Sequence, residues 1–174
     1  MGFIPTYDGA SFPDSANSPT PITPSVFKHG VVAKGKFMGQ VVYLLSSAQL
    51  LALQTTAIQL LNALGANWAY LPTSMSVQYK FNTTAYTIAN ADNRFQIEYT
   101  GKSVNLLSTL ATGLVDQVVN EVVTARPAVV GAIFAQTNMA NLGLELKLAG
   151  TTPALTLGDG TVVVTLGYEI LVLQ

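Results

Sequence analysis

Apolar and polar residues alternate one by one along several long stretches of this chain. In the stretch 74–82, Met75, Val77, Tyr79 and Phe81 are each separated by a single polar residue. The same pattern recurs in two further stretches, 94–100 and 141–148. Successive side chains of a β-strand point to opposite faces, so this alternation predicts strands with one face on a core. We therefore predict a mainly β fold.

The C-terminal stretch 161–173 alternates in the same way but is less polar on its second face. Val162 and Val164 belong to one face, while Val163 and Leu171 belong to the other. A strand that is apolar on both faces is expected to lie in the centre of a sheet or at an interface.

Turn residues separate the expected strands. The run 90–93 follows one strand, and Gly158-Asp159-Gly160 leads directly into the last one. Asp-Gly supplies the positive-φ positions that tight hairpins require, so we expect a hairpin turn at 158–160. Strands with one apolar face and short connections favour an antiparallel β-sandwich over an α/β sheet.

One or two short helices are also expected. Ser46, with Gln49 three positions later, has the spacing of a capping box and predicts a helix start. Apolar residues between 107 and 122 recur at three- and four-residue spacing, which predicts a second short helix near 114–122.

Residues 1–25 differ in composition from the rest, because they hold five of the eight prolines. Each proline fixes φ and lacks an amide donor, so this segment cannot supply a core strand or helix. It is either a loose tail or an extended arm that lies across a neighbouring molecule. The arm is favoured because the segment carries spaced large apolar residues. These candidate partner-binding residues are Phe3, Ile4, Tyr7, Phe12 and Ile22. We expect an arm over 1–28 and a β-sandwich domain over 29–174.

Charged residues make up only 10 % of the chain and hydrophobic residues 49 %, with a net charge of −1. Average soluble domains carry roughly 25 % charged residues, which suggests that partners cover part of this surface. A well-packed monomer coated with Ser, Thr and Asn is the alternative. The basic residues form no stripe, so we expect no nucleic-acid partner. No apolar run reaches the roughly 20 residues that span a bilayer, and no signal peptide is recognised, so a soluble protein is expected.

Candidate catalytic groups are few and dispersed. His29 is the single histidine and the chain has no cysteine, so we expect no metal site and no cofactor. Glu98, Glu145 and Glu169 each fall on the polar register of an expected strand, where solvated carboxylates are normal. Two of them facing each other across a sheet would resemble a glycosidase pair. With so few acids, we expect that the protein is not an enzyme.

Trp68, next to a loop that contains Gly65, is the remaining candidate residue. It is expected either to pack in the core or to anchor a partner.

Several segments, taken together in this order, resemble the small virion proteins of tailed bacteriophages known as capsid decoration or cement proteins. The segments are Ser46–Leu53, Thr83–Tyr86, Phe95–Thr100, Thr112–Gln117, Asn141–Leu146, Gly158–Val164 and Tyr168–Ile170. The resemblance covers roughly residues 40–173 and leaves out the proline-rich arm. It implies a jelly-roll-like β-sandwich that binds the outer surface of an icosahedral head, and it brings no catalytic residues.

On this reading the partners are the major capsid protein and copies of the chain itself, as a trimer or dimer. The protein would be located in the virion, which is assembled in the host cytoplasm. A tail-associated or receptor-binding β-module of a phage is the alternative function, and it would use Trp68 and the neighbouring loops.

Overall fold

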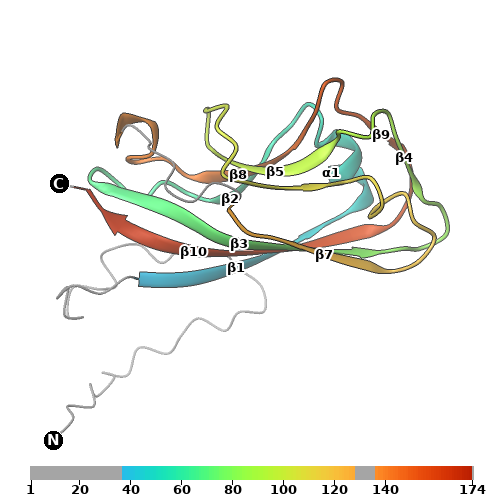
Figure 1. Ribbon diagram of the computed structural model, residues 1–174, viewed down its shortest axis with the longest axis horizontal. Helices are drawn as coiled ribbons and strands as arrows, with labels where there is room; N and C mark the ends of the chain where they lie inside the picture. The colour runs from blue at the N-terminus through green and yellow to red at the C-terminus, as the bar shows by residue number, and fades with distance from the viewer. Residues whose placement is uncertain (1–36, 128–135, 174) are drawn as a thin grey trace, which may run out of the picture.

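Two four-stranded antiparallel sheets face each other in the structure, a computed structural model that describes residues 37–127 and 136–173 (Figure 1). Sheet A has the strand order β1–β10–β3–β7, with β1 (Phe37–Leu45), β10 (Thr161–Val172), β3 (Trp68–Lys80) and β7 (Glu121–Ala125). Sheet B has the order β2–β8–β5–β6, with β2 (Ile58–Leu61), β8 (Leu144–Ala149), β5 (Arg94–Tyr99) and β6 (Leu107–Leu110). A short pair, β4 (Tyr86–Ile88) with β9 (Leu155–Leu157), lies at one end.

The strand order is that of a jelly-roll-like sandwich. Apart from the short β4–β9 pair, the chain passes from one sheet to the other at almost every connection, and only β5 and β6 follow each other within one sheet. Every strand pair is antiparallel. The mainly β class and the antiparallel sandwich that the alternation predicts are therefore confirmed.

The alternating residues form the core as expected. Met75, Val77 and Tyr79 of β3 are at most 1 % exposed, and Phe95 and Ile97 of β5 are fully buried. β10 lies between β1 and β3, so it is central in its sheet, as its two apolar faces suggest. The strands predicted at 74–82, 94–100, 141–148 and 161–173 all have counterparts, which are β3, β5, β8 and β10.

The helix predicted at Ser46 is present as α1 (Ser47–Ala52). The Ser46 hydroxyl accepts a hydrogen bond from the Gln49 amide at 3.3 Å, and the Ser46 amide donates to Gln49 Oε1 at 2.9 Å. Both halves of the capping box are therefore made, and Leu50 is fully buried.

The second helix predicted near 114–122 is wrong. Residues 111–119 form turns and bends, and from Glu121 the chain is strand β7, which pairs with β3. Gly113 has φ +79°, which ends any regular helix there, and its amide donates to Asp116 Oδ1 at 2.7 Å. The valines that follow prefer a strand because they are β-branched. A short 3₁₀ helix, η2 (Gln136–Asn138), is the other helical element in the described part of the chain.

The hairpin predicted at 158–160 is also wrong, although a turn is present. This turn joins β9 to β10, and these strands pair with β4 and with β1 and β3, not with each other. The positive φ expected at Asp159-Gly160 occurs instead at Leu157 and Gly158, at +55° and +78°. The turn therefore carries the chain from the β4–β9 pair into sheet A.

Candidate functional site

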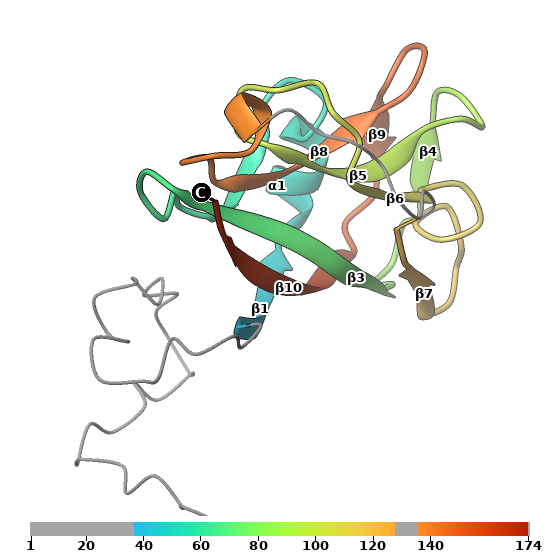
Figure 2. The same cartoon turned by 60° about the vertical axis from the view of Figure 1, so that its left-hand side comes forward.

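The outer face of sheet A, which points away from sheet B, carries few charges. Strand register places Val42, Thr165, Ser76 and Thr124 side by side in one row across its four strands. A second row contains Gln40, Gly167 and Ser74. Figure 2 shows β1 at one edge of this sheet and β7 at the other. The sheet therefore presents hydroxyl, amide and apolar groups to the outside.

A hollow of about 620 Å³ runs across this face, and we call it the trough. Its floor is formed by small residues of the central strands, such as Ser74, Ser76 and Gly167. Its rims carry longer side chains, with Met38 and Gln40 on β1 and Arg126 just after β7. A Cβ atom built on Gly167 would lie 2.6 Å from Ser74 Oγ, so glycine keeps the floor low at this point.

Apolar side chains are exposed on both edge strands of sheet A. On β1, Met38, Val42 and Leu44 are 74 %, 59 % and 63 % exposed, and Val122 on β7 is 59 % exposed. Exposed apolar residues gathered in one place on a soluble protein mark an interaction surface. Within residues 37–127 and 136–173, β1 pairs with β10 alone, so no described strand covers its other edge. We define the trough together with these exposed residues as the candidate partner-binding face.

Part of this face can be recognised in the amino-acid sequence of β1. Met38, Val42 and Leu44 belong to a stretch that is apolar on both registers, as 161–173 is. β10 has two strand neighbours in its sheet, but β1 has one, and its second apolar register is exposed. Only the strand order separates the two cases.

The predicted partner-binding residues are not part of the trough. Trp68 is the first residue of β3 and is partly buried, and its carbonyl accepts a hydrogen bond from the Asn141 amide at 3.0 Å. It lies six residues before Ser74, or about 20 Å along the strand. The other candidates lie outside the described residues, as does the 28/29 domain boundary. They are Phe3, Ile4, Tyr7, Phe12, Ile22 and the histidine His29.

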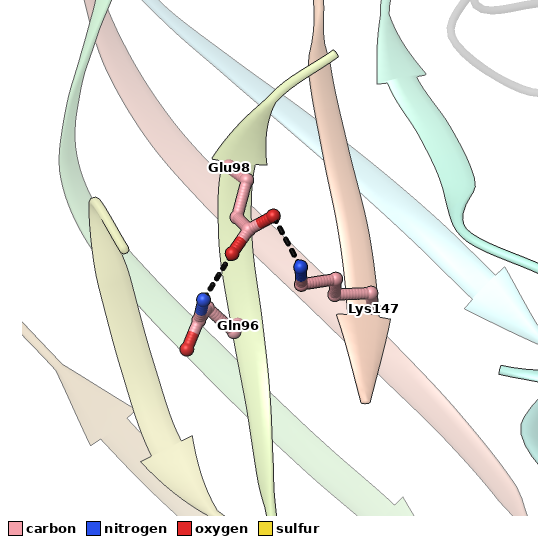
Figure 3. Close-up of polar contacts among 3 residues, drawn as sticks. All are labelled: Gln96, Glu98 and Lys147. Carbon is pink, nitrogen blue, oxygen red and sulfur yellow. Dashed lines mark hydrogen bonds and ion pairs between the residues drawn. The ribbon is translucent and has the colours of Figure 1, made fainter. Parts of the chain in front are cut away.

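The expectation that Glu98, Glu145 and Glu169 are solvated is wrong for two of them. Glu98 is 1 % exposed and Glu169 is 8 % exposed. In Figure 3, Glu98 on β5 points toward Lys147 on β8, whose Nζ lies 2.5 Å from Glu98 Oε2. Gln96 Nε2 donates to the other carboxylate oxygen. The buried carboxylate is thus held by one cation and one amide.

Glu98 and Glu145 are directly opposite each other in the β5–β8 pair, so two glutamates do share one face of sheet B. The trough and a smaller hollow of about 260 Å³ are both lined by other residues. Because Glu98 is buried and paired with Lys147, the arrangement is that of a structural ion pair, whose desolvation is offset only by good geometry.

Asp159 is an extensively hydrogen-bonded carboxylate in the described loops. Its oxygens accept from the backbone amides of Thr83 and Thr84 at 3.0 and 2.9 Å and from Asn82 Nδ2 at 2.8 Å. These bonds, led by the one from the Thr83 hydroxyl, lower the pKa of Asp159 to about 2. In residues 37–127 and 136–173, no group of three or more His, Cys, Asp or Glu side chains is placed to hold a metal ion.

In the same two ranges, no helix has both the length and the apolar character needed to cross a membrane.

Similarity to known proteins is found among solved structures. No protein-family model matches this sequence, and no curated protein matches it. Among solved structures, a chain of the capsid of Ralstonia phage GP4 is similar with a TM-score of 0.44 and 17 % sequence identity. The match covers 81 % of this chain and 86 % of that one.

Proposed function

We propose that this protein is a non-catalytic structural component of a phage virion, and that it acts as a head decoration protein. It would bind the outer surface of the capsid across subunit junctions and stabilise the shell. Its partners would be the major capsid protein and further copies of itself. The resemblance of the segments between Ser46 and Ile170 to decoration proteins motivates the proposal.

The observation that carries the proposal is the partner-binding face of sheet A. Four apolar side chains are at least half exposed there, beside a trough with an uncharged floor. Removing such apolar surface from water by contact with a partner is favourable by roughly 25 cal/mol of free energy per Å². A broad, uncharged face suits a lasting contact within an assembly better than a transient one.

Attachment at many equivalent sites would strengthen the contact. A decoration protein that touches a capsid lattice at several points gains effective concentration from each bond already made. Contacts of modest strength through Val42 and Leu44 would then be sufficient to hold each copy. An oligomer of the chain would multiply this effect.

Co-sedimentation with phage heads that lack the protein tests the proposal. Purified protein is mixed with the heads, and its own mass is measured in parallel by light scattering. Saturable binding by a defined oligomer is expected. If no protein sediments with the heads even when its concentration is far above that of the capsid sites, the decoration role is overturned.

A second candidate function is a tail-associated or receptor-binding module. It is favoured by the hollow of about 260 Å³, which is lined by Gln59, Asn62, Thr100 and Asn141. The backbone amide of Asn141 donates to the backbone carbonyl of Trp68, so the hollow lies next to the start of β3. Amide and hydroxyl side chains such as those that line the hollow suit sugar hydroxyls. Binding to purified host envelope, with none to heads, would favour this function over the first.

A further inference from the structure

We propose that the trough on sheet A binds the N-terminal segment of a second copy of this chain, with residues 8–12 lying across the sheet. The inference goes beyond attachment to a capsid, because it concerns a contact between copies in free solution. Residues 1–36 lie outside the described part of the structure and end next to Phe37, where β1 begins at the rim of the trough. A long segment of suitable composition is therefore connected directly to this face.

The dimensions of the trough match those of residues 8–12. Its rims lie on β1 and just after β7, which are three strand spacings apart, or about 14 Å. Four residues of extended chain span about 12 to 14 Å. Asp8 and Phe12 are four residues apart, so one of them can reach each rim.

The chemistry of the two rims agrees with this placement. Among the described residues that line the trough, Arg126 alone carries a charge, and it is exposed. The charged residues of 1–25 are Asp8 and Asp14, both acidic. Asp8 at Arg126 would place Phe12 at Met38 on the opposite rim, where a thioether and an aromatic ring pack favourably.

The floor suits the residues between these two anchors. Gly9, Ala10 and Ser11 are small and would lie over Ser74 and Gly167 in the floor of the trough. The serine and threonine hydroxyls of the floor can donate hydrogen bonds to carbonyl groups of the segment. An extended chain keeps these carbonyls free, because it makes no internal hydrogen bonds.

Proline content favours a neighbouring copy over the chain's own trough. For Phe12 to reach Met38 of the same chain, the segment between them would have to turn back on itself. Four prolines lie in that segment, at Pro13, Pro19, Pro21 and Pro24, and each favours extended geometry in itself and in its predecessor. The proline content therefore favours a second copy as the molecule that accepts the segment.

Cysteine crosslinking tests the proposal directly, because the chain contains no cysteine. Tagged full-length chains with Ala10→Cys are mixed with untagged chains carrying Ser74→Cys and oxidised under mild conditions. The matched control carries Ser103→Cys, an exposed serine in the connection that follows β5. Crosslinked pairs of tagged and untagged chains should form about tenfold faster with Ser74→Cys than with Ser103→Cys, since binding raises the effective thiol concentration.

Three results would overturn the proposal. Equal crosslinking rates with Ser74→Cys and Ser103→Cys would show that the segment does not prefer the trough. Closure of the Ala10→Cys/Ser74→Cys double variant within single chains, with no mixed pairs, would show that each copy fills its own trough. Arg126→Gln should slow crosslinking about threefold, and an equal effect of Lys80→Gln would overturn the proposed placement of residues 8–12, which depends on Asp8 lying at Arg126. Binding to heads is measured separately, so these results do not depend on the decoration role.

Discussion

The carboxylate of Asp159 accepts hydrogen bonds from both the backbone amide and the hydroxyl of Thr83, at 3.0 and 2.5 Å, although the two residues are 76 positions apart in the chain. The contact fixes the turn that enters β10 against the turn that follows β3. Since β3 and β10 are neighbours in sheet A, this bond closes one end of the longest strand pair.

Stability should fall in acid through Asp159. Its pKa is lowered in the folded protein to about 2, below the ordinary aspartate value of about 3.8. The contribution of a carboxylate with a lowered pKa is present above its unfolded pKa and is lost as the pH falls toward the folded one. We expect the melting temperature of the wild type to drop between about pH 4 and pH 2. The melting temperature of Asp159→Asn should drop less over the same range, because the variant has no carboxylate to protonate there. Thermal melts of wild type, Asp159→Asn and the control Glu121→Gln would measure it. An unchanged pH profile in Asp159→Asn would contradict the prediction.

Removal of Lys147 should destabilise the protein strongly. Its side chain is 29 % exposed and pairs with a Glu98 side chain that is 2 % exposed, so Lys147→Met leaves a buried charge without its cation. The expected loss is about 3 kcal/mol in the free energy of unfolding. A second change, Glu98→Gln, should restore more than half of it, because the amide is neutral and still accepts from Gln96. Urea unfolding of the single and double variants tests this. A double variant less stable than Lys147→Met would show that the charge is not the cause.

Gly143→Ala should be costly for steric reasons. A Cβ at this position would lie 2.2 Å from the Leu61 carbonyl oxygen and 2.3 Å from Gln59 Nε2. Backbone cannot move aside easily, so we expect a loss of about 2 to 3 kcal/mol. Gly65→Ala is the matched control, because it has a positive φ of +108° but nothing within 4 Å of the new Cβ, and about 1 kcal/mol is expected there. Equal losses for the two variants would mean that crowding at Gly143 is unimportant.

Charges placed on the outer face of sheet A should impair assembly without unfolding the protein. Val42 and Leu44 are exposed, so Val42→Glu and Leu44→Glu are expected to change stability by less than about 0.5 kcal/mol. Each should lower the affinity for decoration-free heads about tenfold, because burying an unpaired carboxylate in an interface is unfavourable. Leu110→Glu on β6 of sheet B is the control, with an exposed residue of the same kind. If Leu110→Glu weakened head binding equally, the face of sheet A would not be the attachment surface.

Local patterns in the sequence were sufficient where the deciding contact is local. The Ser46–Gln49 capping box spans three residues, and the alternation around Val77 needs only its neighbours, so both were predicted correctly. The helix expected near 114–122 failed because β7 obtains its hydrogen bonds from β3, a partner distant in the chain. The three- and four-residue spacing of apolar residues there does not reflect a helix.

The partner-binding face required knowledge of strand order. Met38 and Val42 are ordinary strand residues until β1 is known to be an edge strand, and Ser74 and Gly167 form a trough floor only when β10 and β3 are adjacent. The burial of Glu98 depends in the same way on Lys147, which lies on a different strand. Period-two patterning places a residue on a face of its strand, but it does not tell what covers that face.

The position of β10 between β1 and β3 also constrains the order of events during synthesis. Leu45 pairs with Val162 and not with any residue that leaves the ribosome soon after it. The apolar residues of β1 therefore remain without a strand partner in sheet A until residues 161–172 have left the ribosome. Contacts of such high sequence separation form slowly, so sheet A is the part of this protein expected to depend most on protection from aggregation while the chain is being made.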